Sequence, residues 1–179
     1  NNIDVYGNNG HTLTIAKNLQ QGGGLTVQQN SIVEFTAAST YTGDTIINAG
    51  SVRIGAGGSL GGTIVRVGAT SGGNTAGYYI SDADGGTTED TTIVIRNGSS
   101  GTKTLGGLNT SGINTFSGTV ALDDNVTLSA AAGGTMAFSG AISDGAGAGT
   151  FGVAVNAAGT VRLSGSGANS GMTGWTIQE

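Results

Sequence analysis

Residues Ser39–Gly62, STYTGDTIINAGSVRIGAGGSLGG, alternate short β-prone runs with glycine-rich corners. The runs are Asp44–Asn48 and Ser51–Gly55, and a second corner, Gly57–Gly62, follows them. The apolar residues Ile47, Val52, Ile54 and Leu60 are separated by small or polar ones, which is the pattern of half-buried strands. No proline and no Asn-Gly hairpin turn interrupts the segment. We therefore expect the chain to coil from strand to strand rather than to fold back on itself.

The composition of the whole chain supports the same expectation. Its 179 residues include 36 Gly and no Pro or Cys, only 9% are charged, and 36% are hydrophobic. A disordered chain is usually rich in charge and proline and poor in β-branched residues, whereas Val, Ile and Thr recur throughout this one. Glycine follows no three-residue period, which excludes collagen. The sequence predicts a single all-β domain without disulfides.

Internal repeats indicate how the strands are arranged. Thr40–Ile46 aligns with Thr115–Ala121, and Ser170–Thr176 is a looser third copy. In each copy a large apolar residue is followed by Thr or Ser, then Gly, then a strand. We expect the large residue to fill the interior of a coil and the glycine to form its corner.

These units predict a parallel β-solenoid of ~7–8 coils, each of roughly 20–25 residues. The alternative is an antiparallel sandwich, which would also give short strands but does not require one strand-and-corner pattern to recur. The least regular stretches are Gly68–Ala76, Asp82–Asp90 and Asn97–Gly112, and we expect them to be loops on one face of the solenoid.

Ser39–Gly62 resembles the autotransporter-associated β-strand repeat of bacterial passenger domains, which reads Asn-x-Tyr-Thr-Gly-x-Thr-x-Ile-x-x-Gly-x-Leu-x-Leu-Gly. Ser39 stands where that repeat usually has Asn, and Asp44 where it usually has Gly. The resemblance is looser over Asn114–Leu122 and Gly159–Ile177, and Gly68–Gly112 does not match. It implies a right-handed parallel β-helix in a secreted or surface-displayed protein that adheres, aggregates or forms fibres. The repeat is a scaffold and implies no particular ligand.

The two ends of the sequence do not resemble solenoid caps, which are usually polar or helical. We therefore expect residues 1–179 to form one solenoid module with uncapped ends, and to be a fragment or subunit of a longer repetitive protein or fibre. End-to-end self-association is the partner interaction that this predicts.

Charge argues against two classes of partner. The net charge is −5, and the six basic residues are scattered along the chain, so no basic stripe is available to bind nucleic acid. These residues are Lys17, Arg53, Arg66, Arg96, Lys103 and Arg162. No run of 18 apolar residues exists, so the sequence predicts no helical membrane span.

The densest acidic cluster, Asp82, Asp84, Glu89 and Asp90, is the candidate metal site. Carboxylates on a glycine-bearing loop suit Ca²⁺. The spacing does not match an EF-hand, however, because Ile80 and Thr91 would stand at the first and last ligand positions. A solvated acidic turn is the alternative, and no other cofactor is expected.

Tyr78-Tyr79 is the candidate ligand-binding pair. If the pair lies in a strand, one ring points out of the coil, where it can contact surface glycans, and the other packs inside. Parallel β-helices also host enzymes that cleave polysaccharides, and Asp82 and Asp84 with Arg66 or Arg96 are the groups that such chemistry would use here. No strand carries a recurring carboxylate pair, so the sequence favours a protein that is not an enzyme.

The sequence as a whole predicts an extracellular structural or adhesive module, stiffened by stacked coils, whose contacts are with other copies, surface glycans or other cells. The alternative is a carbohydrate-active β-helix protein that binds or cleaves polysaccharide.

Overall fold

The computed structural model describes residues 2–7, 10–62, 64–146, 151–165 and 175–178, and every regular element in them is a β-strand. The strands pair in parallel and form three sheets. Sheet 1 contains β1 (Ile3–Tyr6), β3 (Leu25–Gln28), β5 (Thr45–Ile47), β7 (Ile64–Val67), β10 (Thr92–Ile95), β13 (Val120–Leu122) and β16 (Ile142–Asp144). Sheet 2 contains β2 (Thr12–Ile15), β4 (Ser31–Phe35), β6 (Gly50–Ile54), β8 (Ala76–Ile80), β11 (Lys103–Gly107), β14 (Val126–Ala130), β17 (Val153–Asn156) and β19 (Trp175–Gln178). Sheet 3 contains β9 (Thr88–Glu89), β12 (Ile113–Phe116), β15 (Thr135–Phe138) and β18 (Thr160–Leu163).

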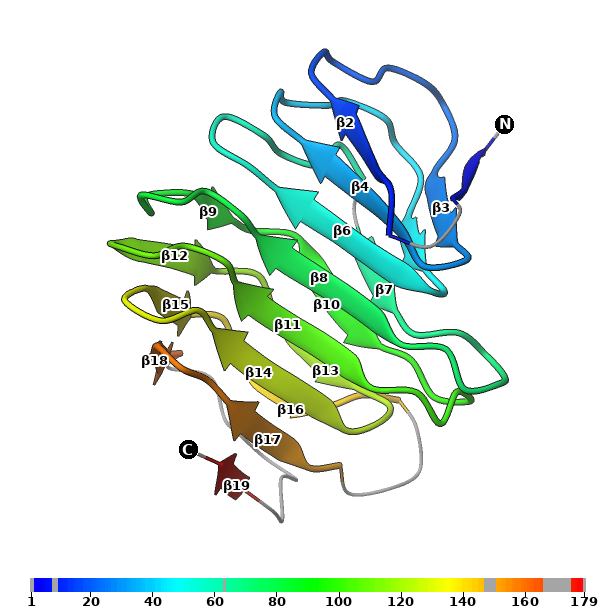
Figure 1. Ribbon diagram of the computed structural model, residues 1–179. Coiled ribbons are helices and arrows are strands. Elements are labelled where there is room, and N and C mark those ends of the chain that lie inside the picture. The colour runs from blue at the N-terminus through cyan, green and yellow to red at the C-terminus, as the bar shows by residue number, and fades with distance from the viewer. Residues whose placement is uncertain (1, 8–9, 63, 147–150, 166–174, 179) are drawn as a thin grey trace.

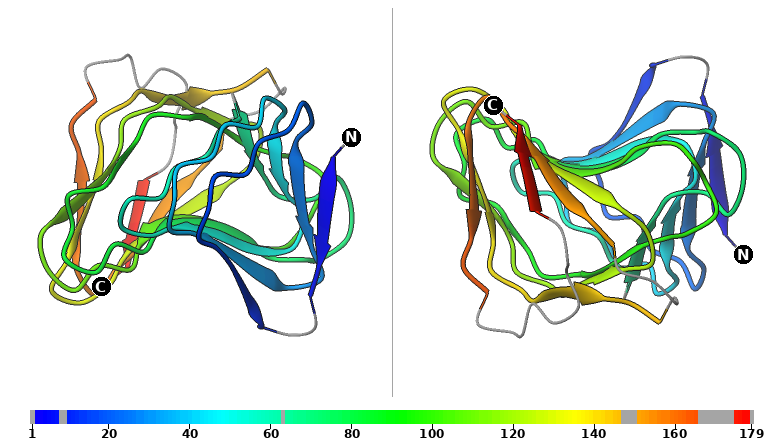
Figure 2. Two further views of the ribbon diagram at one scale, coloured as in Figure 1. Left: turned by 90° about the horizontal axis from the view of Figure 1, so that it is seen from above. Right: turned by 90° about the horizontal axis from the view of Figure 1, so that it is seen from below.

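Sheet 1 contributes one strand to each turn, so the described residues form a parallel β-solenoid of seven turns. Figure 1 shows β6, β8, β11 and β14 side by side in front, with β7 and β10 behind them. The chain passes from back to front at the right of that view and returns at the left while it descends, so the solenoid is right-handed. Seen along its axis, successive turns enclose a common interior (Figure 2). The solenoid predicted from the sequence is confirmed.

The turns are unequal in length. The length of a turn is the sequence separation between paired residues of neighbouring strands in sheet 1. The first three separations are 22, 20 and 20 residues, from the pairs Ile3–Leu25, Leu25–Thr45 and Thr45–Val65. The next three are 28, 27 and 22 residues, from the pairs Ile64–Thr92, Ile93–Val120 and Val120–Ile142. The increase to 28 comes in the turn that adds β9, the first strand of sheet 3. The solenoid therefore changes from two-sheet to three-sheet turns at its fourth turn.

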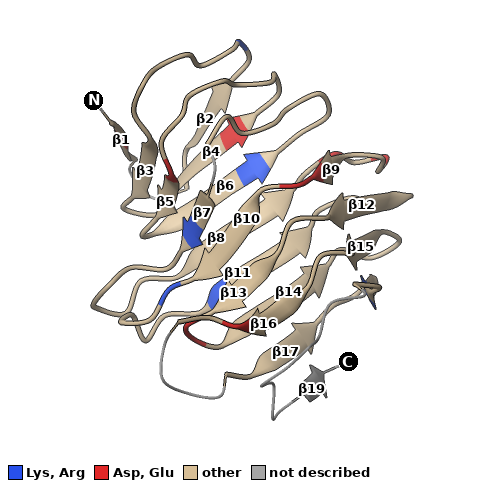
Figure 3. Ribbon diagram, turned by 180° about the vertical axis from the view of Figure 1, so that it is seen from behind, with Lys and Arg blue, Asp and Glu red and all other residues tan. Residues whose placement is uncertain are grey.

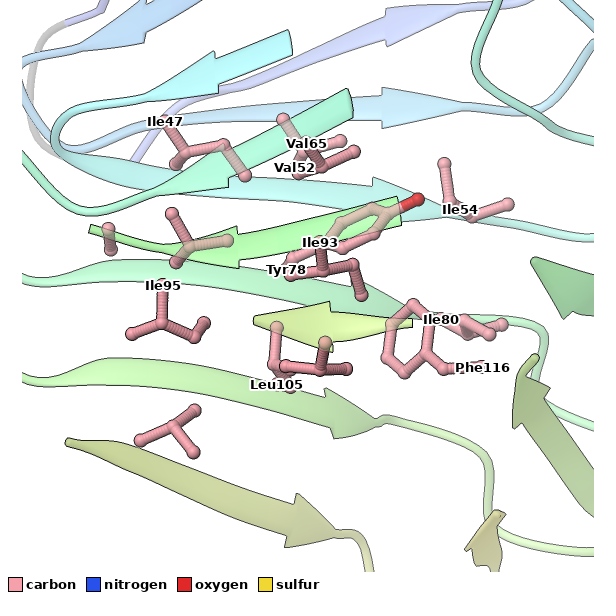
Figure 4. Packing of buried hydrophobic residues seen from close by; sticks show 14 of the residues in the cluster. Ile47, Val52, Ile54, Val65, Tyr78, Ile80, Ile93, Ile95, Leu105 and Phe116 are labelled. Atoms are coloured by element: carbon pink, nitrogen blue, oxygen red, sulfur yellow. The ribbon is translucent and has the colours of Figure 1, made fainter. Parts of the chain in front are cut away.

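Buried apolar side chains from successive turns stack into ladders that fill the interior (Figure 4). In sheet 2 one such ladder consists of Val33, Val52, Tyr78, Leu105 and Leu128, all fully buried. The Tyr78 ring packs against aromatic residues of sheet 3. Its centroid lies 5.0 Å from that of Phe116, and the centroid of Phe116 lies 5.6 Å from that of Phe138. Stacking of like residues across parallel strands is what holds a solenoid together.

The large residues of the sequence repeat lie in the interior, as predicted. Tyr41 is fully buried, its ring centroid is 6.4 Å from that of Phe35, and its hydroxyl lies 2.5 Å from Oγ1 of Thr45. Phe116, the equivalent residue of the second copy, is 1% exposed. Met172 in the third copy lies outside the described residues.

Two buried asparagines bond to neighbouring turns. Nδ2 of the fully buried Asn114 donates to the carbonyl of Asp82, and its Oδ1 accepts from the amide of Thr87. Nδ2 of Asn109, also fully buried, donates to carbonyls that include that of Thr135 in the next turn, whereas its Oδ1 has no hydrogen-bond partner among the described residues. Each asparagine therefore links two turns through backbone groups.

Two of the predicted loops contain strands. Residues 97–112, expected to be a loop, include β11, which pairs with β8 on one side and β14 on the other. Residues 82–90 include the short strand β9. Both predictions were wrong for the same reason: these strands are defined by pairing between turns, whereas their own sequences are short or rich in glycine. Residues 68–75, most of the remaining stretch, do connect β7 to β8 as a loop.

Charged residues are few, and several lie beside an opposite charge, as Glu34 on β4 does beside Arg53 on β6 (Figure 3). Arg66 pairs with Asp44 of the preceding turn, Nε to Oδ2 at 2.7 Å, and Nη1 of Arg96 donates to Oδ1 of Asn48. Burial, and secondarily the charge of Arg66, lowers the pKa of Arg96. The two arginines are thus engaged with polar groups of their own sheet.

Candidate functional site

The acidic residues singled out in the sequence do not converge. Asp82 accepts a hydrogen bond from Oγ1 of Thr87 at 2.8 Å, Asp84 and Asp90 are exposed, and Glu89 points into the core with 3% exposure. Among the described residues, no group of three or more acidic, His or Cys side chains could hold a metal ion. Glu89 points inward while Asp84 and Asp90 are exposed, so the four side chains do not come together in this structure, and calcium binding by them stays a prediction.

Tyr78 and Tyr79 lie on opposite faces of β8, as the sequence predicted for a pair in a strand. Tyr78 is fully buried, so it cannot contact a ligand at the surface. Tyr79 is half-buried on the outer face of sheet 2. Of the two candidate ligand-binding residues, only Tyr79 retains that role as a prediction.

Glu89 forms a buried polar cluster with Tyr78, Tyr41 and Thr91. Oγ1 of Thr91 donates a short hydrogen bond to Oε1 of Glu89. Burial is the largest cause of a raised pKa for the Glu89 carboxyl, while Thr91 and Tyr78 act in the opposite direction. Burial also raises the pKa of Tyr41 to about 12, and that of Tyr78 well above its usual range, with the charge of Glu89 contributing to both.

Two atoms of this cluster, Oε2 of Glu89 and Oη of Tyr78, are buried without a hydrogen bond of ordinary geometry among the described residues. A carboxyl with a raised pKa in an apolar core favours its protonated form. The cluster can therefore hold a proton, but it is closed to ligands because all of its side chains lie inside the coil.

An open polar pocket of about 610 Å³ lies at the beginning of β11, β14 and β17. We call it the corner pocket. Its lining consists of Ser99, Ser100, Gly101, Thr102, Lys103, Asp124, Asn125, Val126, Thr127, Gly152, Val153 and Ala154. The corner between β13 and β14 spans only residues 123–125, and two of these residues, Asp124 and Asn125, line the pocket.

A buried ion pair forms part of the lining. Nζ of Lys103 lies 2.6 Å from Oδ2 of Asp124, with side-chain exposures of 4% and 24%, and also donates to the carbonyl of Ser99. Its aliphatic chain packs against Gly68, whose missing Cβ would lie 3.1 Å from Cε of Lys103. The ammonium therefore bonds to the corners of two successive turns, and the aliphatic chain contacts the corner of a third.

The same network extends into the next turn. Oδ1 of Asp124 accepts from the amide of Asn125 at 2.7 Å, and Oδ1 of Asn125 accepts from the amide of Gly152 at 2.6 Å. Because these groups hold one another, the wall of the pocket is preorganised. The two charges compensate each other, so the pocket presents hydroxyl and amide groups without a net charge.

Sequence reasoning did not find this pocket. Its lining comes from three segments that are distant in sequence, and Thr102-Lys103-Thr104 was placed in a loop. The available signal was Lys103 itself, since a lysine at an inward position next to a corner requires a carboxylate partner. Asp124 in Asp123-Asp124, one turn later, is that partner.

The described part of the chain contains no helix long and apolar enough to cross a membrane. Comparisons with known proteins give no family for the chain: no family model, no curated protein and no solved structure matches it.

Proposed function

We propose that the chain is a structural and adhesive module of an extracellular, surface-displayed rod or fibre and has no catalytic role. The resemblance of Ser39–Gly62 to autotransporter passenger repeats supports this proposal. The observation that carries it is the unbroken ladder of sheet 2, in which eight parallel strands stack, with a mostly apolar inner face from β4 to β14. Every inner strand is hydrogen-bonded on both sides, which makes such a stack stiff along its axis.

The edge of the first turn supports contact with further coils. Leu13 on β2 stands in register with Val33, which is fully buried, yet Leu13 is 47% exposed. Tyr6 on β1 is 60% exposed. An apolar edge strand is a template for pairing with another strand, so we propose that a second copy stacks on this edge.

Sedimentation velocity at increasing protein concentration tests the assembly. We expect end-to-end association in the unaltered chain and its loss in Leu13→Lys, because a lysine at this inward position blocks stacking. Thr14→Lys on the outer face of the same strand is the matched control and should still associate. A protein that stays monomeric at every concentration would contradict the rod proposal. Labelling of intact expressing cells with a membrane-impermeant reagent tests surface display.

Carbohydrate binding is the second candidate, and the observation that favours it is the uncharged, hydroxyl-rich corner pocket on the same sheet face as Tyr79. Assays on polyuronates and neutral glycans separate binding from cleavage. Turnover that disappears in Asp82→Ala or Asp84→Ala would make the protein an enzyme and overturn the structural proposal.

A further inference from the structure

The Tyr79 ring lies flat on the outer face of sheet 2. A Cβ at Gly77, two residues earlier on the same strand, would come within 2.3 Å of Cε2 and 2.8 Å of Cζ of Tyr79. A Cβ at Gly106, the partner of Tyr79 on β11, would lie 3.2 Å from its Cδ1. The ring thus occupies space that two glycines leave free, and any side chain at Gly77 would lift it off the sheet.

A row of hydroxyl groups connects this ring to the corner pocket. Gly77, beneath the ring, pairs with Thr104 on β11, and Thr104 pairs with Thr127 on β14. Thr104 and Thr127 are both half-buried at outer positions, and Thr127 lines the pocket. Parallel strands are about 4.8 Å apart, so the row from Gly77 to Thr127 is about 10 Å long and runs along the solenoid axis.

The chemistry of this row suits a sugar chain. A flat aromatic face packs against the C–H face of a sugar ring, and hydroxyl and amide side chains bind its hydroxyl groups. The charges next to the row are those of Lys103 and Asp124, which neutralise each other at 2.6 Å, and those of Arg53, the neighbour of Tyr79 on β6, and Glu34, the neighbour of Arg53 on β4. Each of these groups already has an opposite charge beside it, so a ligand with a net charge would have to compete with that charge.

We propose that a short, neutral oligosaccharide binds along the outer face of sheet 2, with one ring on Tyr79 and the next ones over Thr104 and Thr127 in the corner pocket. This inference rests on the carbohydrate-binding candidate above and names its ligand class and its orientation, parallel to the solenoid axis. It is independent of end-to-end assembly.

Isothermal titration calorimetry with four neutral hexasaccharides (of cellulose, laminarin, maltose and mannan type) and with hexagalacturonate tests the proposal. We expect at least one neutral probe to bind and to bind more tightly than hexagalacturonate. Tyr79→Ala and Thr127→Val should each weaken that binding by about tenfold, because one removes the stacking face and the other a hydroxyl group.

The matched controls are Tyr6→Ala, an exposed tyrosine on sheet 1, and Thr14→Val, an outer threonine on β2, and both should bind like the unaltered protein. Absence of binding by every neutral probe, tighter binding of hexagalacturonate, or equal losses in the control variants would overturn the inference. Thr127→Val is nearly isosteric, so it gives an answer even if Tyr79→Ala does not fold. Sedimentation velocity of Tyr79→Ala and Thr127→Val keeps this outcome separate from the rod proposal, since neither of these two substitutions lies on the edge formed by β1 and β2.

Discussion

Glu89 occupies a ladder position that the following turns of sheet 3 give to Phe116 and Phe138. It is the first residue of that ladder, where sheet 3 begins, and it faces Tyr78 from the sheet 2 ladder. A carboxylate among aromatic rings is costly unless it is protonated or well bonded. Burial among these rings is the largest cause of the raised pKa of Glu89, and the hydrogen bond from the Thr91 hydroxyl acts in the opposite direction.

The raised pKa of Glu89 predicts a dependence of stability on pH. The folded protein holds this proton more tightly than the unfolded chain, whose carboxyl titrates near 4.5. The protonated Glu89 therefore adds fully to the free energy of unfolding below pH 4.5, and this contribution is lost as the pH rises through the pKa of Glu89 in the folded protein. Its size is about 1.4 kcal/mol for each unit by which the pKa of the folded state exceeds that of the unfolded chain. We expect Glu89→Gln to remove this part of the decline, measured by urea unfolding at a series of pH values.

Glu34→Gln is the control for loss of a carboxylate. Glu34 lies on the outer face of β4 and accepts a hydrogen bond from Ser81 at 2.7 Å. This variant should keep the decline that Glu89→Gln loses. An unchanged pH profile in Glu89→Gln would show that Glu89 is not the group responsible.

Gly50 provides a second test at single-residue scale. Its φ is 91°, and a Cβ there would lie 2.1 Å from the carbonyl oxygen of Ser31. Gly50→Ala combines backbone strain with a clash and should lower the free energy of unfolding by about 1–3 kcal/mol or more. Gly22→Ala, where a Cβ meets nothing within 4 Å, should be neutral or slightly stabilising. Equal melting temperatures for the two variants would contradict this account of the corner.

At the scale of elements, β11 and β14 are joined by more than their backbone hydrogen bonds. Lys103, the first residue of β11, forms an ion pair with Asp124 in the corner before β14 and donates to the carbonyl of Ser99 in the corner before β11. Lysine is the more buried partner of the two. Removing it leaves a carboxylate in a partly buried corner without its cation, which is the situation in which the loss of one partner is expensive.

We therefore expect Lys103→Met to lower the free energy of unfolding by about 3 kcal/mol, and the double variant Lys103→Met/Asp124→Asn to recover part of that loss. The exposed pair Arg66–Asp44 is the comparison, since its side chains are 35% and 30% exposed. Arg66→Met should cost less than about 1 kcal/mol. Chemical denaturation measures both, and equal costs would refute a special role for the buried pair.

The elements differ in how far their own sequences define them. The predicted runs Asp44–Asn48 and Ser51–Gly55 match β5 and β6 within one residue at each end. β11 was missed because Lys103 and the pair Gly106-Gly107 are unfavourable in an isolated strand. It forms because β8 and β14 lie on either side of it, and glycine at 106 leaves room for the Tyr79 ring.

Across the whole molecule, a strand that is hydrogen-bonded on both sides should be more resistant to local unfolding than a strand at the edge of its sheet. β8 and β11 have partners on both sides and fully buried inner residues, whereas β2 pairs only with β4 and its Leu13 is exposed. We expect amide hydrogen exchange to be slowest in β8 and β11 and markedly faster in β2. Mass spectrometry of exchanged peptides measures this order. Protection in β2 equal to that in β8 would indicate that another strand covers the β2 edge in solution.

The sequence predicted the solenoid and the outward position of one ring of Tyr78-Tyr79, since both follow from short-range alternation and repetition. The corner pocket could not be identified in this way. It depends on segments that are distant in sequence and on the ion pair between Lys103 and Asp124, one turn apart. The burial of Glu89 was also hidden, because a charged residue beside Asp90 in a Gly- and Thr-rich stretch resembles a solvated turn.

The unequal turns help each strand to pair with the correct neighbour during folding. If all turns were alike, a growing stack could pair a strand with the wrong neighbour and slip by one turn at little cost, as fibrillar aggregates of identical segments do. Here β9 pairs only with β12 of the following turn, so a stack that skipped that turn would leave β9 without its partner. Gene duplications or deletions would meet the same restriction: whole turns can be exchanged within the two-sheet part or within the three-sheet part, but not across the junction at Glu89.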